Sequence, residues 1–169
     1  MSGMTHAVDA TDRLDHATIT RIVERLIPFN RHLGLRVCGL AEGAATIELP
    51  YRDELIGNPL LPSLHGGAIA MLLDATGGAA VWTRVSRDDL ISTIDLRVDF
   101  LRPARPEPLV ARGRVVRLGN RVGVVELRAS HAGEEERPIA AGTGVYSIRR
   151  GVGGAQLEGW RAAVARPAE

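Results

Sequence analysis

The chain of 169 residues is poor in cysteine, lysine and aromatic side chains. Its single cysteine, Cys38, excludes an internal disulfide and any metal site built from cysteines, and it favours a reducing compartment, so we expect a cytoplasmic protein. All 21 basic residues are arginines and stand against 20 acidic residues, which leaves a net charge of +1. The basic residues do not cluster, so the sequence predicts binding neither to nucleic acid nor to a membrane surface.

Long apolar runs are also missing. The first fifteen residues lack the apolar core of a secretory signal, and the longest apolar run is interrupted by an acid and several glycines, so it predicts a core helix and no membrane span. We expect a disordered segment at 1–15, one domain at 16–150 and a tail at 151–169 with a short helix near Trp160.

The central stretch Leu64–Trp82, LHGGAIAMLLDATGGAAVW, is apolar almost all round, and Asp74 lies in its middle. A carboxylate buried there without compensation costs several kcal/mol, so it must be paired, protonated or used in chemistry. The preceding His65-Gly66-Gly67 offers unpaired backbone N–H groups where the helix begins. This stretch therefore predicts a buried helix with a function.

Most of the remaining chain alternates between apolar and polar residues, which predicts strands. An amphipathic helix is expected at 17–27, ending at Pro28. In the clearest alternation, at 91–101, every second residue from Ile94 to Phe100 shares one face, and Thr93 lies on the other face with the three acidic or basic residues in between. The expected strands cover residues 35–41, 44–51, 91–101, 109–118, 121–130 and 138–148. The pattern predicts an α+β protein in which an antiparallel sheet of five to six strands wraps around the long central helix.

These motifs resemble the hotdog fold and, within it, the PaaI-type acyl-CoA thioesterase family. The resemblance is collinear over about 17–149 and rests on PFNRHLGLRV (28–37), LHGGAIAMLLDATG (64–77), IDLRVDFLRPAR (94–105), RLGNR (117–121) and AAGTGVYSI (140–148). It implies a single hotdog domain that hydrolyses acyl-CoA thioesters to free acid and CoA without a metal or other cofactor. It also implies a homodimer or homotetramer with active sites at the subunit interface.

The resemblance assigns the main catalytic roles to the central helix. Asp74 would attack the thioester or activate the water that does, and the Gly66 N–H would stabilise the developing oxyanion at the helix N-terminus. His65 would orient this turn or contact the thioester, and Gly67 would help to bind the substrate. A plainer alternative for Asp74 is an ion pair with arginine or a loop cap. The small neighbours Gly77 and Gly78 would leave a slot beside Asp74 for another helix or a ligand.

Four further residues outside this helix are candidates. By resemblance, Asn58 and Thr93 would belong to the catalytic site, although a loop asparagine also forms turns and a strand threonine is unremarkable. Arg102 and Arg121 flank turns and would bind the CoA phosphates, or they are simply solvated charges. Trp82, at the end of the helix, lies in the core or an interface, or borders the acyl pocket.

The spacing in the sequence places the two main catalytic candidates, the Gly66 N–H and the Asp74 carboxylate, far apart on the helix. Gly66 and Asp74 are eight residues apart, which is about 12 Å along a helix at 1.5 Å per residue, so they cannot reach one carbonyl carbon from the same chain. We therefore expect each site to combine two subunits related by a two-fold axis. Two rival functions are a non-catalytic acyl-CoA-binding or regulatory protein and an acyl-CoA dehydratase or hydratase.

Overall fold

The computed structural model describes residues 12–152, 158–159 and 162. Residues 1–11 of the expected disordered segment, and Trp160 in the expected tail helix, lie outside the described residues. Residues 12–15 contact the rest of the domain, since the Arg87 N–H donates to the Asp12 carbonyl (2.8 Å) and the Asp15 side chain caps the first helix by accepting from Thr18 N–H (2.7 Å). Domain contacts therefore begin before residue 16.

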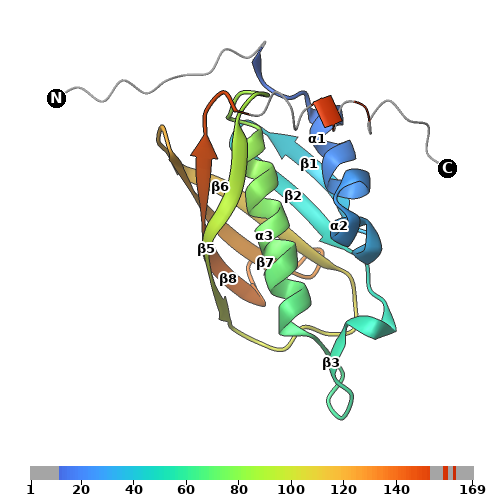
Figure 1. The fold of residues 1–169 in the computed structure, drawn as a ribbon. Helices are drawn as coiled ribbons and strands as arrows, with labels where there is room; N and C mark the ends of the chain where they lie inside the picture. Colours follow the sequence, from blue (N-terminus) through green and yellow to red (C-terminus); the bar gives the residue numbers. More distant parts are fainter. Residues whose placement is uncertain (1–11, 153–157, 160–161, 163–169) are drawn as a thin grey trace.

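A six-stranded antiparallel sheet forms the body of the protein, with the strand order β1-β2-β6-β7-β8-β5. Its strands are β1 (Arg36–Ala41), β2 (Ala44–Leu49), β5 (Leu90–Phe100), β6 (Leu109–Leu118), β7 (Val122–Ser130) and β8 (Ala140–Arg149). The helix α3 (Gly66–Trp82) lies along one face of this curved sheet (Figure 1). The predicted α+β architecture is confirmed, and it is that of the hotdog fold.

Alternating residues of the sheet and one long helix build the core. Leu72 and Leu73 of α3 are fully buried and belong to the same apolar cluster as Ile47, Leu109 and Leu127 from the central strands. Because α3 packs against β2, β5, β6, β7 and β8, it needs apolar residues around most of its circumference. This explains why the sequence of α3 has so few polar residues.

The predicted helix at 17–27 is divided into two shorter pieces and ends directly before Pro28 as expected, but a further helix that starts at Pro28 was not predicted. α1 (His16–Arg21) continues into a π-helical turn, η2 (Ile22–Leu26), and a separate helix, α2 (Pro28–Leu33), follows. Pro28 begins α2, because the first turn of a helix needs no N–H from that position and proline already has a helical φ. α2 is important for the site described below.

The strand β5 contains a β-bulge that the sequence alternation did not predict. Its register against β8 shifts between Thr93 and Asp95, so Ile94 is the additional residue and its side chain is 60% exposed. The expected sharing of one face by Ile94 and Leu96 is therefore wrong. The bulge instead turns Thr93 toward α3, on the same side as Leu96.

A short hairpin precedes α3 where the sequence predicted only a loop. After the 3₁₀ turn η3 (Asp53–Leu55), the strands β3 (Ile56–Asn58) and β4 (Ser63–Leu64) pair and project from the end of the molecule (Figure 1). At its tip, Leu60 and Leu61 are 90% and 74% exposed. Among the described residues, no helix is long and apolar enough to cross a membrane.

Candidate active site

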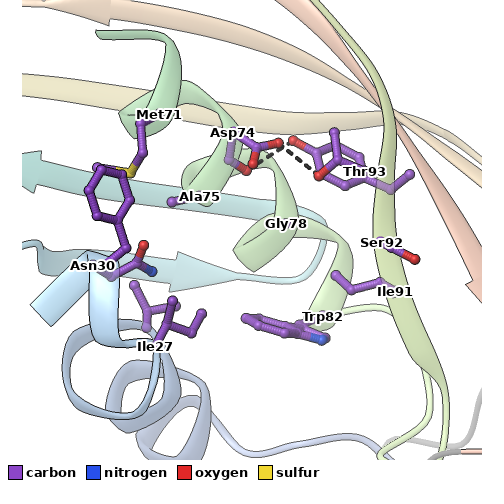
Figure 2. A pocket seen from close by; sticks show the side chains of 13 residues that line it. Ile27, Asn30, Met71, Asp74, Ala75, Gly78, Trp82, Ile91, Ser92 and Thr93 are labelled. Atoms are coloured by element: carbon purple, nitrogen blue, oxygen red, sulfur yellow. Dashed lines mark hydrogen bonds between the residues drawn. The ribbon is translucent and has the colours of Figure 1, made fainter. Parts of the chain in front are cut away.

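Asp74 lies in the middle of α3, half-buried, where the helix passes the bulged part of β5. The Thr93 hydroxyl donates a hydrogen bond of 2.9 Å to Asp74 Oδ1 (Figure 2). This contact exists because the bulge at Ile94 turns Thr93 toward the helix. Among the described residues, no arginine forms an ion pair with Asp74. The alternative in which Asp74 is paired with an arginine is therefore not seen within these residues.

Tyr146 of β8 supports the helix directly beneath Asp74. Its side chain is buried, and its hydroxyl donates a hydrogen bond of 3.0 Å to the backbone carbonyl of Asp74. Burial, and secondarily the Asp74 charge, raises the pKa of Tyr146 well above its usual value, so the phenol stays neutral and remains a donor. A Cβ at Gly77 would collide with this hydroxyl, so the slot expected beside Asp74 is filled at Gly77 by Tyr146.

A cavity of about 310 Å³ opens beside Asp74 and follows the same face of α3 towards its C-terminus. Its walls come from η2, α2, α3, β5 and β8, and Gly78 leaves room along the helix (Figure 2). The lining residues are mainly apolar and comprise Val23, Ile27, Phe29, Asn30, Met71, Asp74, Ala75, Gly78, Trp82, Ile91, Ser92, Thr93 and Tyr146. Trp82 lines this cavity and also packs against the apolar core, so the expected core position holds, and its role at an acyl pocket stays a prediction. The cavity provides apolar space next to a carboxylate.

The N-terminal turn of α3 has a different construction. His65 is the N-cap residue, its Nδ1 accepts a hydrogen bond of 2.9 Å from the Gly67 N–H, and its own N–H donates to the Leu55 carbonyl (2.7 Å). The Gly67 N–H is therefore occupied. No described residue accepts a hydrogen bond from the Gly66 N–H, which leaves this group as an available donor at the positive end of the helix dipole.

The structure brings together only some of the predicted site residues. Asp74 and Thr93 share one cavity, whereas Gly66, His65 and Asn58 do not line it. Asn58 lies in the β3–β4 hairpin, where its Oδ1 accepts hydrogen bonds from the N–H groups of Leu60 (3.0 Å) and Leu61 (3.3 Å). In one chain, Asn58 forms a turn, and its catalytic role stays a prediction.

The two predicted phosphate-binding arginines lie at opposite ends of the sheet. Arg102 follows the end of β5, near the start of α3, whereas Arg121 precedes β7, whose first residue pairs with Ser147 near the end of β8. Both side chains are exposed, and neither forms an ion pair with a described residue. By contrast, Arg105 is held by Glu107 (2.9 Å) and Glu134 (2.7 Å). Arg102 and Arg121 are therefore free to bind an external anion.

Tyr146 and Asn30 line the cavity but were not identified from the sequence. For Tyr146, the available signal was Gly144, two residues earlier on the same face of β8, because a Cβ at Gly144 would lie 2.7 Å from the tyrosine ring. Asn30 had no comparable signal. Its position depends on the break at Ile27, where the chain leaves the helical conformation before α2 begins.

Known proteins show the same sequence pattern and the same fold. Residues 61–137 match the model of the thioesterase superfamily. The chain is 35% identical over 135 residues to the medium/long-chain acyl-CoA thioesterase YigI of Escherichia coli. The aligned region covers 72% of this chain and 86% of YigI.

Solved structures agree. A thioesterase family protein from Silicibacter pomeroyi superposes with a TM-score of 0.71 at 27% identity, covering 79% of this chain and 98% of that protein. A protein from Shewanella oneidensis related to the thioesterase superfamily superposes with a TM-score of 0.66 at 32% identity. The match covers 79% of this chain and 94% of that protein. The fold and these likenesses define a thioester hydrolase. The chain belongs to the thioesterase superfamily.

Proposed function

We propose that the protein hydrolyses acyl-CoA thioesters to a free acid and CoA, with Asp74 as the catalytic carboxylate. The observation that carries the proposal is the half-buried Asp74 carboxylate, which accepts a hydrogen bond from Thr93 at the head of an apolar cavity. Such a cavity suits an acyl chain, and the adjacent carboxylate suits attack on the carbonyl at its end. The relative YigI bears the name of a medium/long-chain acyl-CoA thioesterase, which supports the same substrate class.

The reaction joins an oxygen to the thioester carbonyl carbon and breaks its bond to sulfur. In one route Asp74 attacks the carbon and water then hydrolyses the acyl-aspartyl anhydride; in the other, Asp74 takes a proton from water as the water attacks. In both routes negative charge develops on the carbonyl oxygen, where the Gly66 N–H stabilises it, and the CoA sulfur leaves as a thiolate that takes up a proton. No metal or other cofactor takes part in this proposal.

The Gly66 N–H and Asp74 meet only if two copies of the chain cooperate. We propose a homodimer, alone or within a homotetramer, in which two α3 helices lie antiparallel beside the edge strand β5. No described residue pairs with the outer edge of β5, and β5 exposes Ile94 and Phe100, with Leu101 directly after it, which suits an interface. A two-fold axis would also bring Arg121 of the second copy to the end of the molecule where Arg102 lies, next to one bound CoA.

Mixed dimers test the catalytic and the oligomeric proposal together. Asp74→Asn removes the carboxylate but keeps an oxygen for Thr93, so we expect kcat to fall about 10³-fold with an unchanged melting temperature. Gly66→Pro removes the N–H at the first helical position, where proline is accepted. Each variant alone should keep about 1% or less of the wild-type activity, but dimers reassembled from an equal mixture should regain about a quarter of it, because half of the dimers contain one intact site.

The outcomes separate the rival functions. Release of thiol from acyl-CoA by wild type, measured with a thiol-reactive dye, excludes the non-catalytic binder. The dehydratase or hydratase is disfavoured because no histidine is among the described residues that line the cavity. An active Asp74→Asn protein would overturn the role of Asp74. Mixed dimers that stay inactive, although mass spectrometry shows that they have formed, would overturn the shared site.

A further inference from the structure

Asn30 is a buried polar residue in the cavity wall that faces α3. It belongs to α2, only 5% of it is exposed, and its carboxamide lines the same cavity as Asp74 (Figure 2). No described residue forms a hydrogen bond with this carboxamide. The polar atoms of this carboxamide are not among the fully buried unpartnered atoms of the described residues, so water in the open cavity can hydrate them. An apolar group that displaces this water leaves the amide unpaired at a cost of about 1–3 kcal/mol, whereas a polar group that pairs with the amide avoids this cost.

The backbone holds Asn30 firmly in this position. α2 begins at Pro28, directly after the extended residue Ile27, and the Asn30 carbonyl accepts a hydrogen bond of 3.1 Å from the Leu35 N–H after the helix has ended. Leu33, one turn later, is buried in the core. The fixed backbone and the burial of Asn30, which is only 5% exposed, keep its side chain on the cavity side of α2, where it is available to an occupant of the cavity.

The surroundings of Asn30 define what it would bind. Ile27, Met71 and Ile91 provide aliphatic walls, and the flexible Met71 adapts to chains of different shape. The other side chains in the lining with polar atoms are Asp74, Trp82, Ser92, Thr93 and Tyr146, which belong to α3, β5 and β8, whereas Asn30 comes from the opposite wall. An amide offers two N–H donors and one acceptor oxygen, so it pairs well with a hydroxyl or keto oxygen.

We infer that Asn30 is a specificity residue that selects aliphatic acyl chains bearing a hydroxyl or keto oxygen over unsubstituted chains of the same length. The inference rests on the proposed thioesterase function, since it takes Asp74 to mark the thioester end of the cavity. A hydroxyl both donates to and accepts from the carboxamide. A plain chain leaves the amide unpaired, and this loss is what the site discriminates against.

The test compares acyl-CoAs that differ in a single oxygen. We would measure kcat/KM of the wild-type enzyme for octanoyl-CoA and for hydroxyoctanoyl-CoAs with the hydroxyl at each successive carbon beyond C2. We expect one position, or two adjacent ones, to be preferred over octanoyl-CoA by about tenfold or more, the value of one buried hydrogen bond. This measurement needs no variant and is independent of whether an altered protein folds.

Variants then assign the preference to Asn30. In Asn30→Leu, which has a similar shape, the preference should fall below about twofold and octanoyl-CoA should be hydrolysed at least as well, because the amide no longer needs a partner. Ile27→Val is the matched control, since it changes the same cavity without a polar group and should keep the preference. Melting temperatures show whether Asn30→Leu folds, and Asn30→Ala replaces it if it does not.

Failure of this inference differs from failure of the proposed function. Hydrolysis of octanoyl-CoA and every hydroxyoctanoyl-CoA at equal efficiency would overturn the role of Asn30 and leave Asp74 as the catalytic residue. If no acyl-CoA is hydrolysed, the thioesterase proposal fails, and calorimetric Kd values for the same compounds decide the inference: a tighter complex with a hydroxylated chain supports it, and equal Kd values overturn it.

Discussion

The N-terminal turn of α3 and its middle carry different chemical groups and are fixed by different contacts. At the turn, the available group is a backbone N–H at Gly66, and neighbours within about ten residues hold it in place, namely His65 and the Leu55 carbonyl. In the middle, the group is the side chain of Asp74. Thr93, 19 residues away, donates to its carboxylate, and Tyr146, 72 residues away, donates to its backbone carbonyl. Contacts between residues close in sequence therefore fix the position of the backbone donor, whereas contacts between residues far apart in sequence fix the position of the acid.

Among the variants below, the largest loss of kcat is expected at the N-terminal turn of α3. Two substitutions of Gly66 are compared there, and they differ in whether the backbone N–H is kept. Gly66→Ala and Gly66→Pro both place a Cβ about 3.2 Å from the Phe100 ring, but only proline lacks the N–H. We expect kcat to fall about 10²-fold or more in Gly66→Pro, the cost of losing an oxyanion donor, and less than about tenfold in Gly66→Ala. Steady-state thiol release measures both.

Equal losses in the two Gly66 variants would show that the Phe100 contact matters and that the N–H does not. The residue before the substitution favours the experiment, because His65 already has φ −64° and ψ 130°, a conformation that precedes proline without strain. Circular dichroism should confirm that α3 still forms in both proteins. The turn can therefore be tested without disturbing Asp74.

A second pair tests the support of the middle of the helix. Gly77→Ala places a methyl group against the Tyr146 hydroxyl and should lower the free energy of unfolding by about 1–3 kcal/mol. Gly78→Ala meets nothing closer than 3.9 Å, so it should be neutral or stabilise the helix by up to about 1 kcal/mol. Urea denaturation measures both, and a Gly77→Ala protein as stable as Gly78→Ala would show that Tyr146 moves aside without cost.

The smallest effect is expected from the hydroxyl that contacts Asp74. Thr93→Val keeps the shape of the side chain but removes its hydrogen bond to the carboxylate, so we expect kcat to fall about tenfold with KM nearly unchanged. Thr143→Val, on the exposed opposite face of β8, is the matched control and should behave as wild type. If both variants keep full activity, Asp74 does not depend on Thr93 for its orientation.

The sequence by itself determined the elements whose pattern is local. The 17-residue helix with Asp74, the antiparallel strands and the unpaired donor at Gly66 all follow from hydrophobic periodicity and from the geometry of a helix N-terminus. The separation of Gly66 from Asp74 follows from the rise per residue of a helix. Each of these conclusions needs only residues that are neighbours in the chain.

Only the tertiary structure decided which distant residues surround Asp74. The bulge at Ile94 inserts one residue into β5 and reverses the face on which Thr93 lies, and the π-helical turn before Pro28 places Asn30 in the wall of the cavity. Tyr146 occupies the space that Gly77 leaves. A periodic pattern cannot show a one-residue insertion or a packing partner 69 residues away, because both are settled by how the strands and helices fit together.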